Sequence, residues 1–141
     1  MTYERGQLIE AIEDVLPYDG PHEPEKVADA ASGLYELVRY MNNATFAGRA
    51  LPHARTVDQV LGGVRSSLYA MDQLFRQLTW ALAEGEAGRN LYHDDNRDDP
   101  AAGERTAQEL QAAIRALQQQ VAAAAASADA CTALSTHLGN S

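Results

Sequence analysis

The chain has 141 residues and a formal net charge of −9, from 20 acidic and 11 basic residues. This length is enough for one domain with a core of its own, and the single cysteine, Cys131, excludes an intrachain disulfide. The acidic balance and the scattered arginines weigh against binding to nucleic acid. No run of about 18 apolar residues occurs, so we expect no membrane span, no secretory signal and a cytoplasmic location.

Two helices are predicted in the first third of the chain. Over 4–16 the apolar residues share one face, and Pro17 ends this helix because proline disfavours a helical conformation in the residue before it. A joint rich in proline and glycine follows. A second helix over 25–47 then spaces its apolar residues by fours and threes, as expected of a helix that buries one face.

A third helix is predicted over 57–84, with Thr56 as N-cap and Gln59 completing a capping box. Its apolar stripe is wide, so we expect this helix at the centre of the core. Gly62 and Gly63 lie inside it, and because glycine costs about 1 kcal/mol relative to alanine there, the pair is expected to reflect close packing or a kink. The stripe consists of Val57, Val60, Leu61, Val64, Leu68, Met71, Leu74, Phe75, Leu78 and Leu82.

A long alanine-rich helix is predicted over 100–138, with Asp99 as N-cap and Pro100 at its first position. Its apolar residues keep a four-three spacing that must be buried against other helices, and Cys131 fits there as a small buried thiol. At about 1.5 Å per residue this helix is about 55 Å long, against about 40 Å for the third. The excess either frays, packs on the first helix or projects to another subunit. The spaced residues are Leu110, Ile114, Leu117, Val121, Ala124, Ala128, Cys131 and Leu138.

Together these segments predict an all-α fold, an antiparallel helical bundle of three long helices plus a short N-terminal helix, in a single domain over 1–141. Few charged pairs flank the apolar residues of the last helix. This composition favours packing within the chain over an extended dimeric coiled coil.

The third helix also carries large polar and aromatic side chains on the face opposite its line of Val64, Met71 and Leu78. These side chains are either covered by another helix or form a surface for a protein partner, since exposed tyrosine, tryptophan and arginine are typical interface anchors. The candidate partner-binding residues are Tyr69, Gln73, Arg76 and Trp80.

A second polar set lies between the second and third helices. Arg39 and Asn43 are four residues apart and share a helix face, and His53 is in the loop that follows. These groups either tie the helix end to its loop or receive a carboxylate or phosphate. An enzyme that uses them is the third functional hypothesis.

The acidic loop from His93 to Asp99 imitates part of a calcium-binding loop, but Asp99 occupies the place of the required glycine and Arg105 that of the closing glutamate. We therefore interpret it as a solvated loop whose last carboxylates cap the following helix. The histidines lie at no ligand spacing, and no phosphate-binding or nucleophile motif is present. We expect no catalytic residue, no metal and no cofactor.

The stretches over 37–45 and 68–78, with the alanine-rich helix that closes the chain, resemble small all-helical proteins of high-GC actinobacteria that have no assigned activity. This resemblance implies a bacterial, cytoplasmic setting and transfers no site residue.

The sequence thus predicts a non-enzymatic protein-protein interaction module that binds another protein or itself, possibly as a homodimer, and neither nucleic acid nor membranes. The alternative is a helical bundle that binds a small molecule or ion and carries an acidic loop. Light scattering separates the two, because self-association requires more than a monomer at high concentration.

Overall fold

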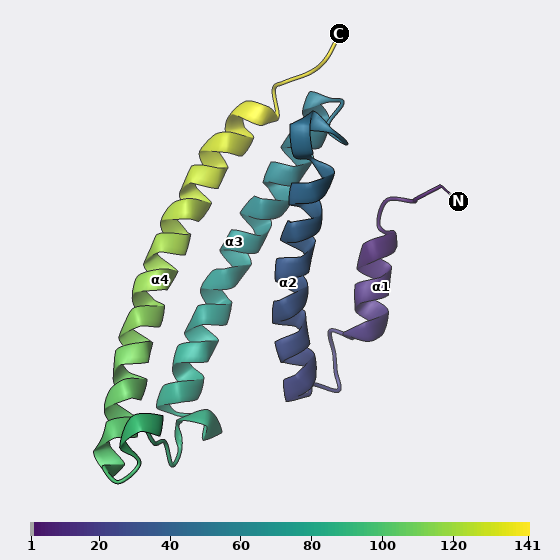
Figure 1. Ribbon diagram of the computed structural model, residues 1–141. Helices are drawn as coiled ribbons and strands as arrows, with labels where there is room; N and C mark the ends of the chain where they lie inside the picture. Colours follow the sequence, from purple (N-terminus) through teal and green to yellow (C-terminus); the bar gives the residue numbers. More distant parts are fainter. Residues whose placement is uncertain (1) are drawn as a thin grey trace. The chain divides into compact units, whose positions relative to one another are not determined.

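The computed structural model describes residues 2–141 and is all-α, as Figure 1 shows. Within this range there is no strand, which confirms the predicted class with one short and three longer helices. The α-helices are α1 (Gln7–Val15), α2 (Pro24–Ala44), α3 (Ala54–Ala83) and α4 (Pro100–Ser135). The 3-10 helices are η1 (Phe46–Gly48), η2 (Glu86–Gly88) and η3 (Asp94–Asn96).

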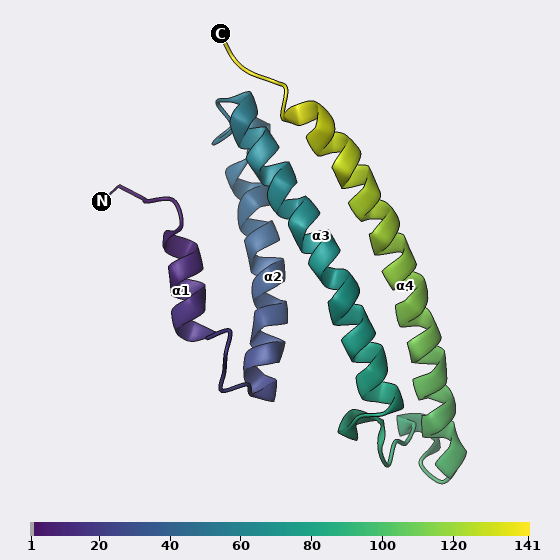
Figure 2. The same cartoon turned by 180° about the vertical axis from the view of Figure 1, so that it is seen from behind.

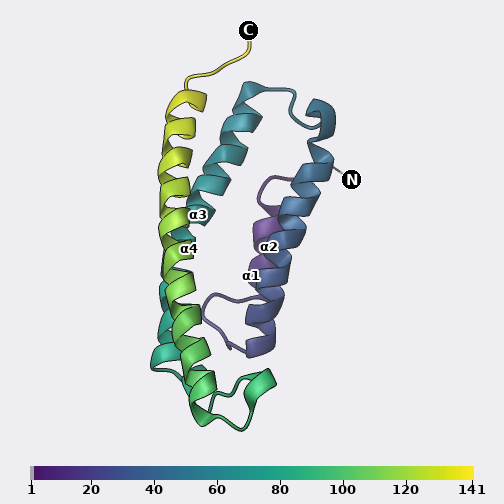
Figure 3. The same cartoon turned by 60° about the vertical axis from the view of Figure 1, so that its left-hand side comes forward.

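The chain divides into two compact units, Met1–Ala50 and Leu51–Ser141. The first contains α1 and α2, which run in opposite directions (Figures 1 and 3). Helix α2 ends at Ala44, three residues before the predicted end. Thr45 caps it by donating its hydroxyl proton to the Met41 carbonyl oxygen at 2.7 Å, and Ala47, with φ of 54°, departs from the helical conformation.

Helix α3 begins earlier than predicted, because its N-cap is His53, whose backbone is extended. The capping box of Thr56 and Gln59 was therefore wrong: Thr56 lies in the first turn, and its amide donates to the His53 carbonyl oxygen at 3.0 Å. Of the two expectations for Gly62 and Gly63, close packing was wrong, since no atom lies within 4 Å of a Cβ placed on either, and a kink stays a prediction.

The start of α4 confirms the prediction. Asp99 is the N-cap and accepts a hydrogen bond from the Ala101 amide at 3.0 Å, and Pro100 occupies the first helical position. The helix is continuous over 36 residues, about 54 Å, and ends at Ser135, three residues short of the predicted 138.

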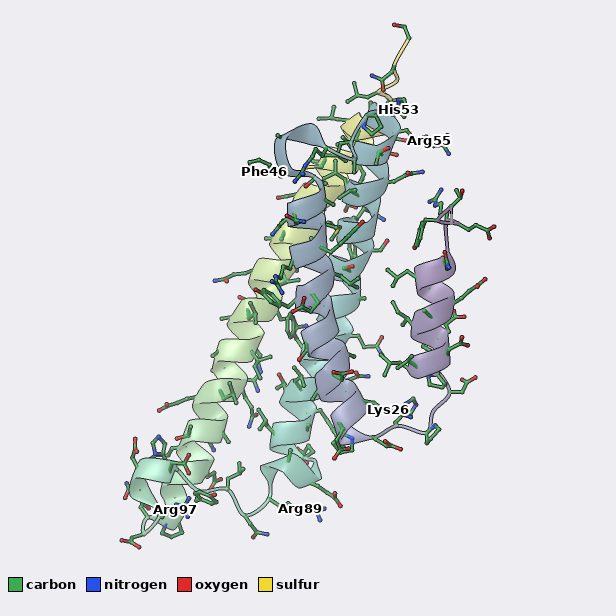
Figure 4. All side chains as sticks on the ribbon, turned by 45° about the vertical axis from the view of Figure 1, so that its right-hand side comes forward. Lys26, Phe46, His53, Arg55, Arg89 and Arg97 are labelled. Atoms are coloured by element: carbon green, nitrogen blue, oxygen red, sulfur yellow. The ribbon has the colours of Figure 1, made fainter. Side chains whose placement is uncertain are left out.

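In the second unit α3 and α4 run antiparallel and side by side, as Figures 1 and 2 agree. At one end the Ala54 amide donates to Asn140 Oδ1 at 2.7 Å, which joins the start of α3 to the C-terminal tail. The extra length of α4 therefore lies at the other end, where a Cβ on Gly103 would come within 2.3 Å of the Leu91 backbone. Figure 4 shows the two ends, with His53 at the first and Arg97 at the second.

The face of α4 that packs on α3 differs from the predicted one. The residues of α4 that pack on α3 include Ile114, Val121 and Ala128, as predicted. The other predicted residues from Leu110 to Cys131 are each replaced in this face by the residue one position later in the chain. Cys131 is exposed and Leu138 is 63% exposed, so both were wrongly placed in the core. The buried and half-buried series is Ala107, Gln111, Ile114, Gln118, Val121, Ala125, Ala128, Thr132 and Ser135.

Candidate interaction surface

The face of α3 toward α4 combines two lines of residues with a seven-residue repeat. One line is apolar and the other polar, and all eight side chains are half-buried. The apolar line is Leu61, Leu68, Phe75 and Leu82, and the polar line is Asp58, Arg65, Asp72 and Thr79. A four-three spacing that includes polar residues is a recurrent device for setting the register of paired helices.

Three members of the polar line contact α4. Asp58 accepts a hydrogen bond from the Ser135 hydroxyl, and Asp72 accepts one from Gln118 Nε2 at 2.7 Å. Arg65 forms an ion pair with Asp129. These contacts fix which residues of the two helices lie opposite one another.

Asp129 is shared by two residues of α3. The Tyr69 hydroxyl and the Arg65 guanidinium both donate to its carboxylate, and the guanidinium also lies 5.0 Å from the centre of the Tyr69 ring. The hydrogen bonds from Tyr69 and Arg65 hold the pKa of the Asp129 carboxyl below its usual range. The hydrogen bond to Asp129 raises the pKa of Tyr69 and that of Arg65.

The Tyr69–Asp129 hydrogen bond identifies one side of the helix pair. Tyr69 lies four positions after Arg65, a residue of the polar line of α3. Asp129 lies four positions after Ala125, a residue of α4 that packs on α3. This side, together with Arg76, which pairs with Asp72 at 2.8 Å, is called the polar face below. Tyr69 and Asp129 lie on the same side of the helix pair. The residues on the opposite side of each helix must therefore lie together on the other face of the pair.

That other face, called the apolar face below, is formed by the residues one position before the interface lines. Its leucine and valine side chains are 39–63% exposed, and Cys131 is also exposed. No charged residue belongs to either line. The residues are Val57, Val64, Met71 and Leu78 of α3, Leu110, Leu117, Ala124 and Cys131 of α4, and Leu138 just beyond the end of α4. Two helices side by side therefore present a continuous hydrophobic surface, which in proteins is typical of an interaction site.

The predicted partner-binding set of α3 lies on and beside the polar face. Tyr69 and Arg76 are engaged within the chain, by Asp129 and Asp72. Gln73 is exposed, and Trp80 is 62% exposed. Partner binding by this set stays a prediction, but its two free members are Gln73 and Trp80.

The predicted ligand set is divided between the two units. Arg39 pairs with Glu36 at 3.4 Å, and the Asn43 carbonyl oxygen accepts from Arg49 Nη2 at 3.1 Å. His53 is the exposed N-cap of α3 and makes no side-chain capping bond. The Arg49 side chain thus ties the end of α2 to the following loop through the Asn43 backbone, and a role of Arg39, Asn43 and His53 in ligand binding or loop stitching stays a prediction.

The acidic loop is held by contacts of its own. His93 Nδ1 accepts from the Asp95 amide at 3.1 Å, and Arg97 stacks 4.6 Å from the Tyr92 ring centre. The Arg105 guanidinium, 2.8 Å away, lowers the pKa of Asp99. Across residues 2–141 no three histidine, cysteine, aspartate or glutamate side chains are gathered to hold a metal ion. Within the same range no helix is long and apolar enough to cross a membrane.

The first unit has a groove of about 650 Å³ between α1 and α2. Its wall is mostly apolar, with a tyrosine on each side. The lining residues are Tyr3, Gln7, Leu8, Ala11, Leu37 and Tyr40. The groove was not predicted from the sequence, which indicated only the apolar face of the first helix.

No family model, curated protein or solved structure matches this chain. What the chain can bind is therefore inferred from the geometry of the two faces.

A signal for the apolar face was present in the sequence. The residues Leu110, Leu117, Ala124, Cys131 and Leu138 repeat every seven positions, and so do Val57, Val64, Met71 and Leu78. Both lines were assigned to the core because apolar periodicity does not distinguish a side chain buried in its own chain from one that awaits a partner.

Proposed function

We propose that this protein is a non-enzymatic interaction module that binds another protein, or a second copy of itself, through the faces of its helices. The apolar face of α3 and α4 carries this proposal. Among residues 2–141 every buried apolar residue is an alanine, while Leu110 and Leu117 are 46% and 44% exposed. Covering leucine and valine side chains is worth about 1.5–3 kcal/mol each, so this face gains free energy from a partner.

The polar face supports a non-enzymatic role. Arg65, Tyr69 and Asp129 satisfy one another, so these three groups with shifted pKa values are used to hold α3 against α4. We also propose a bacterial cytoplasm as the setting, because an exposed thiol such as Cys131 stays reduced there.

The proposal is tested by paired variants of the two faces. Val64→Asp with Leu117→Asp places charges on the apolar face, and Trp80→Ala is the matched change beside the polar face. We expect both proteins to keep the helical circular dichroism signal of the wild type. A partner that is purified with the wild type from its native cell should be lost from the double variant and retained by Trp80→Ala.

Two results would contradict the proposal. If the double variant loses its helical signal, the apolar face belongs to the interior of its own chain. If it folds and retains every partner of the wild type, the apolar face is not the binding surface.

A second candidate, binding of a small apolar molecule, is favoured by the groove between α1 and α2. Its volume of about 650 Å³ lies in the range of ligand sites. The fluorescence of 1-anilinonaphthalene-8-sulfonate bound to the protein should fall when Leu37→Asp alters the groove and should persist in a Leu8→Ile control. Equal fluorescence of the wild type and Leu37→Asp would exclude the groove as the dye site.

A further inference from the structure

The charge of the second unit is concentrated at one end. Between Glu84 and Glu109 there are eight acidic residues and three arginines, a net charge of −5. Beyond Glu109, the remainder of the chain has only Arg115 and Asp129, which cancel. The apolar face therefore crosses the nearly neutral part of the second unit, so the second units of two copies can approach there with little repulsion, while residues 1–50 carry a further net charge of −5 from nine acidic and four basic residues.

We propose that the occupant of the apolar face is the same face of a second copy, with α4 antiparallel to α4 and α3 antiparallel to α3. This inference rests on the proposed function and names its partner. Antiparallel packing follows from the charges. A parallel pair would bring two ends of charge −5 together, whereas antiparallel packing separates them by about the 54 Å length of α4. That separation far exceeds the screening length of about 8 Å at physiological salt.

The spacing of the apolar residues specifies the register. A two-fold axis at Ala124, the smallest residue of the α4 line, places Leu117 opposite Cys131 of the second copy and Leu110 level with Leu138, which follows the end of α4. The small alanine side chains at the centre allow the helices to approach closely.

The α3 line agrees with the same axis. Its midpoint lies between Val64 and Met71. The contacts of Arg65 with Asp129 and of Asp72 with Gln118 place that part of α3 level with Ala124. One axis therefore centres both lines, although they come from different helices.

The area is sufficient for a stable dimer. The line from Leu110 to Leu138 spans 28 residue steps, about 42 Å, the α3 line spans 21 steps, about 31 Å, and each helix is about 10 Å wide. The footprint of about 700 Å² per copy lies within the range of stable protein-protein interfaces.

Disulfide trapping in the full chain tests the register. Leu117→Cys, with native Cys131 retained, should give a covalent dimer on mild oxidation, because the two thiols of different copies then face each other. Ala124→Cys with Cys131→Ser should also be trapped, across the axis. The wild type and Leu117→Cys with Cys131→Ser are controls and should stay uncrosslinked, since their thiols are about 21 Å apart and a disulfide needs Cα atoms within about 7 Å.

Each other outcome overturns this inference. A wild-type Cys131 disulfide dimer indicates parallel packing. Sedimentation equilibrium at 100–200 μM (about the concentration range of weak dimers) tests the dimer itself. If the protein is a monomer there and keeps its helical signal, another protein or residues 2–50 of the same chain cover the apolar face. The proposed function fails separately, by loss of the helical signal in the Val64→Asp and Leu117→Asp variant.

Discussion

The two faces of the α3 and α4 pair contrast in how their side chains are satisfied. On the polar face Arg65, Tyr69 and Asp129 bond to one another within the chain. On the apolar face Leu110 and Leu117 remain nearly half exposed. The difference teaches that the polar contacts specify how α3 lies against α4, whereas the free energy still to be gained by burial lies on the opposite face.

The largest expected effect is on dimerisation. It makes thermal stability depend on protein concentration through the apolar face and not through the polar face. Leu117→Asp should weaken dimerisation about 100-fold, because it removes the burial of a leucine and places a charge in the interface. The wild-type melting temperature should rise with protein concentration, and that of the variant should not. Asp129→Asn should lower the melting temperature equally at all concentrations. Calorimetry at protein concentrations from 5 to 200 μM (about fortyfold in concentration) measures the melting temperatures of both variants. A concentration-dependent effect of Asp129→Asn would show that the polar face also contributes to dimerisation.

The segment that connects α3 to α4 packs closely on Gly103 at the start of α4. A larger side chain at this position should therefore destabilise the protein. Gly103→Ala places a Cβ 2.3 Å from the carbonyl carbon and oxygen of Leu91, so we expect a loss of about 2 kcal/mol in the free energy of unfolding. Gly63→Ala is the matched control, in open space within α3, and should stabilise by about 0.5–1 kcal/mol. Urea denaturation decides, and equal effects would show that Leu91 moves aside.

The Thr79 hydroxyl is buried and has no hydrogen-bond partner within residues 2–141. Asp58, Arg65 and Asp72 of the same polar line all have partners on α4. Thr79→Val should therefore stabilise the protein by about 1 kcal/mol, measured by urea denaturation, since an unsatisfied buried hydroxyl is removed. Thr56→Val, in the half-buried first turn of α3, is the control; a loss of stability in Thr79→Val alone would reveal an unrecognised partner.

The smallest expected effect is on the stability of the protein at low pH. The pKa of Asp129 is lowered in the folded protein, so its ionised form contributes stability above its ordinary pKa of 3.8. This contribution is lost as the pH falls through the lower pKa of the folded state. Asp129→Asn should have a shallower decline of melting temperature between pH 5 and pH 2, the range about the carboxyl pKa. Parallel curves for the variant and the wild type would mean that Arg65 and Tyr69 do not perturb Asp129 in solution.

Local signals predicted the elements well where a residue acts on its own neighbours. Asp99 and Pro100 start α4 as expected because capping depends on adjacent backbone amides. Thr56 failed as an N-cap because His53 was already extended and could take that position. The end of α2 failed because no sequence rule indicated the positive φ of Ala47.

The candidate site was predicted less well, for a physical reason. Tyr69 was recognised as a large side chain on one face, but its bond to Asp129 joins residues 60 positions apart. Cys131 was assigned to the core because its spacing suits burial, yet it is exposed. The aromatic set with Gln73, Arg76 and Trp80 stays a prediction, as do the actinobacterial resemblance and the single domain.

The sequence by itself determined the helices, because their periodicity, caps and breakers act within a few residues. It also determined that the negative charge of the second unit gathers between Glu84 and Glu109. Only the tertiary structure decided which flank of each helix meets the other. Several lines on α4 have the same seven-residue repeat, and contacts such as that between Asp72 and Gln118 select one of them. The flank left over on both helices became the apolar face.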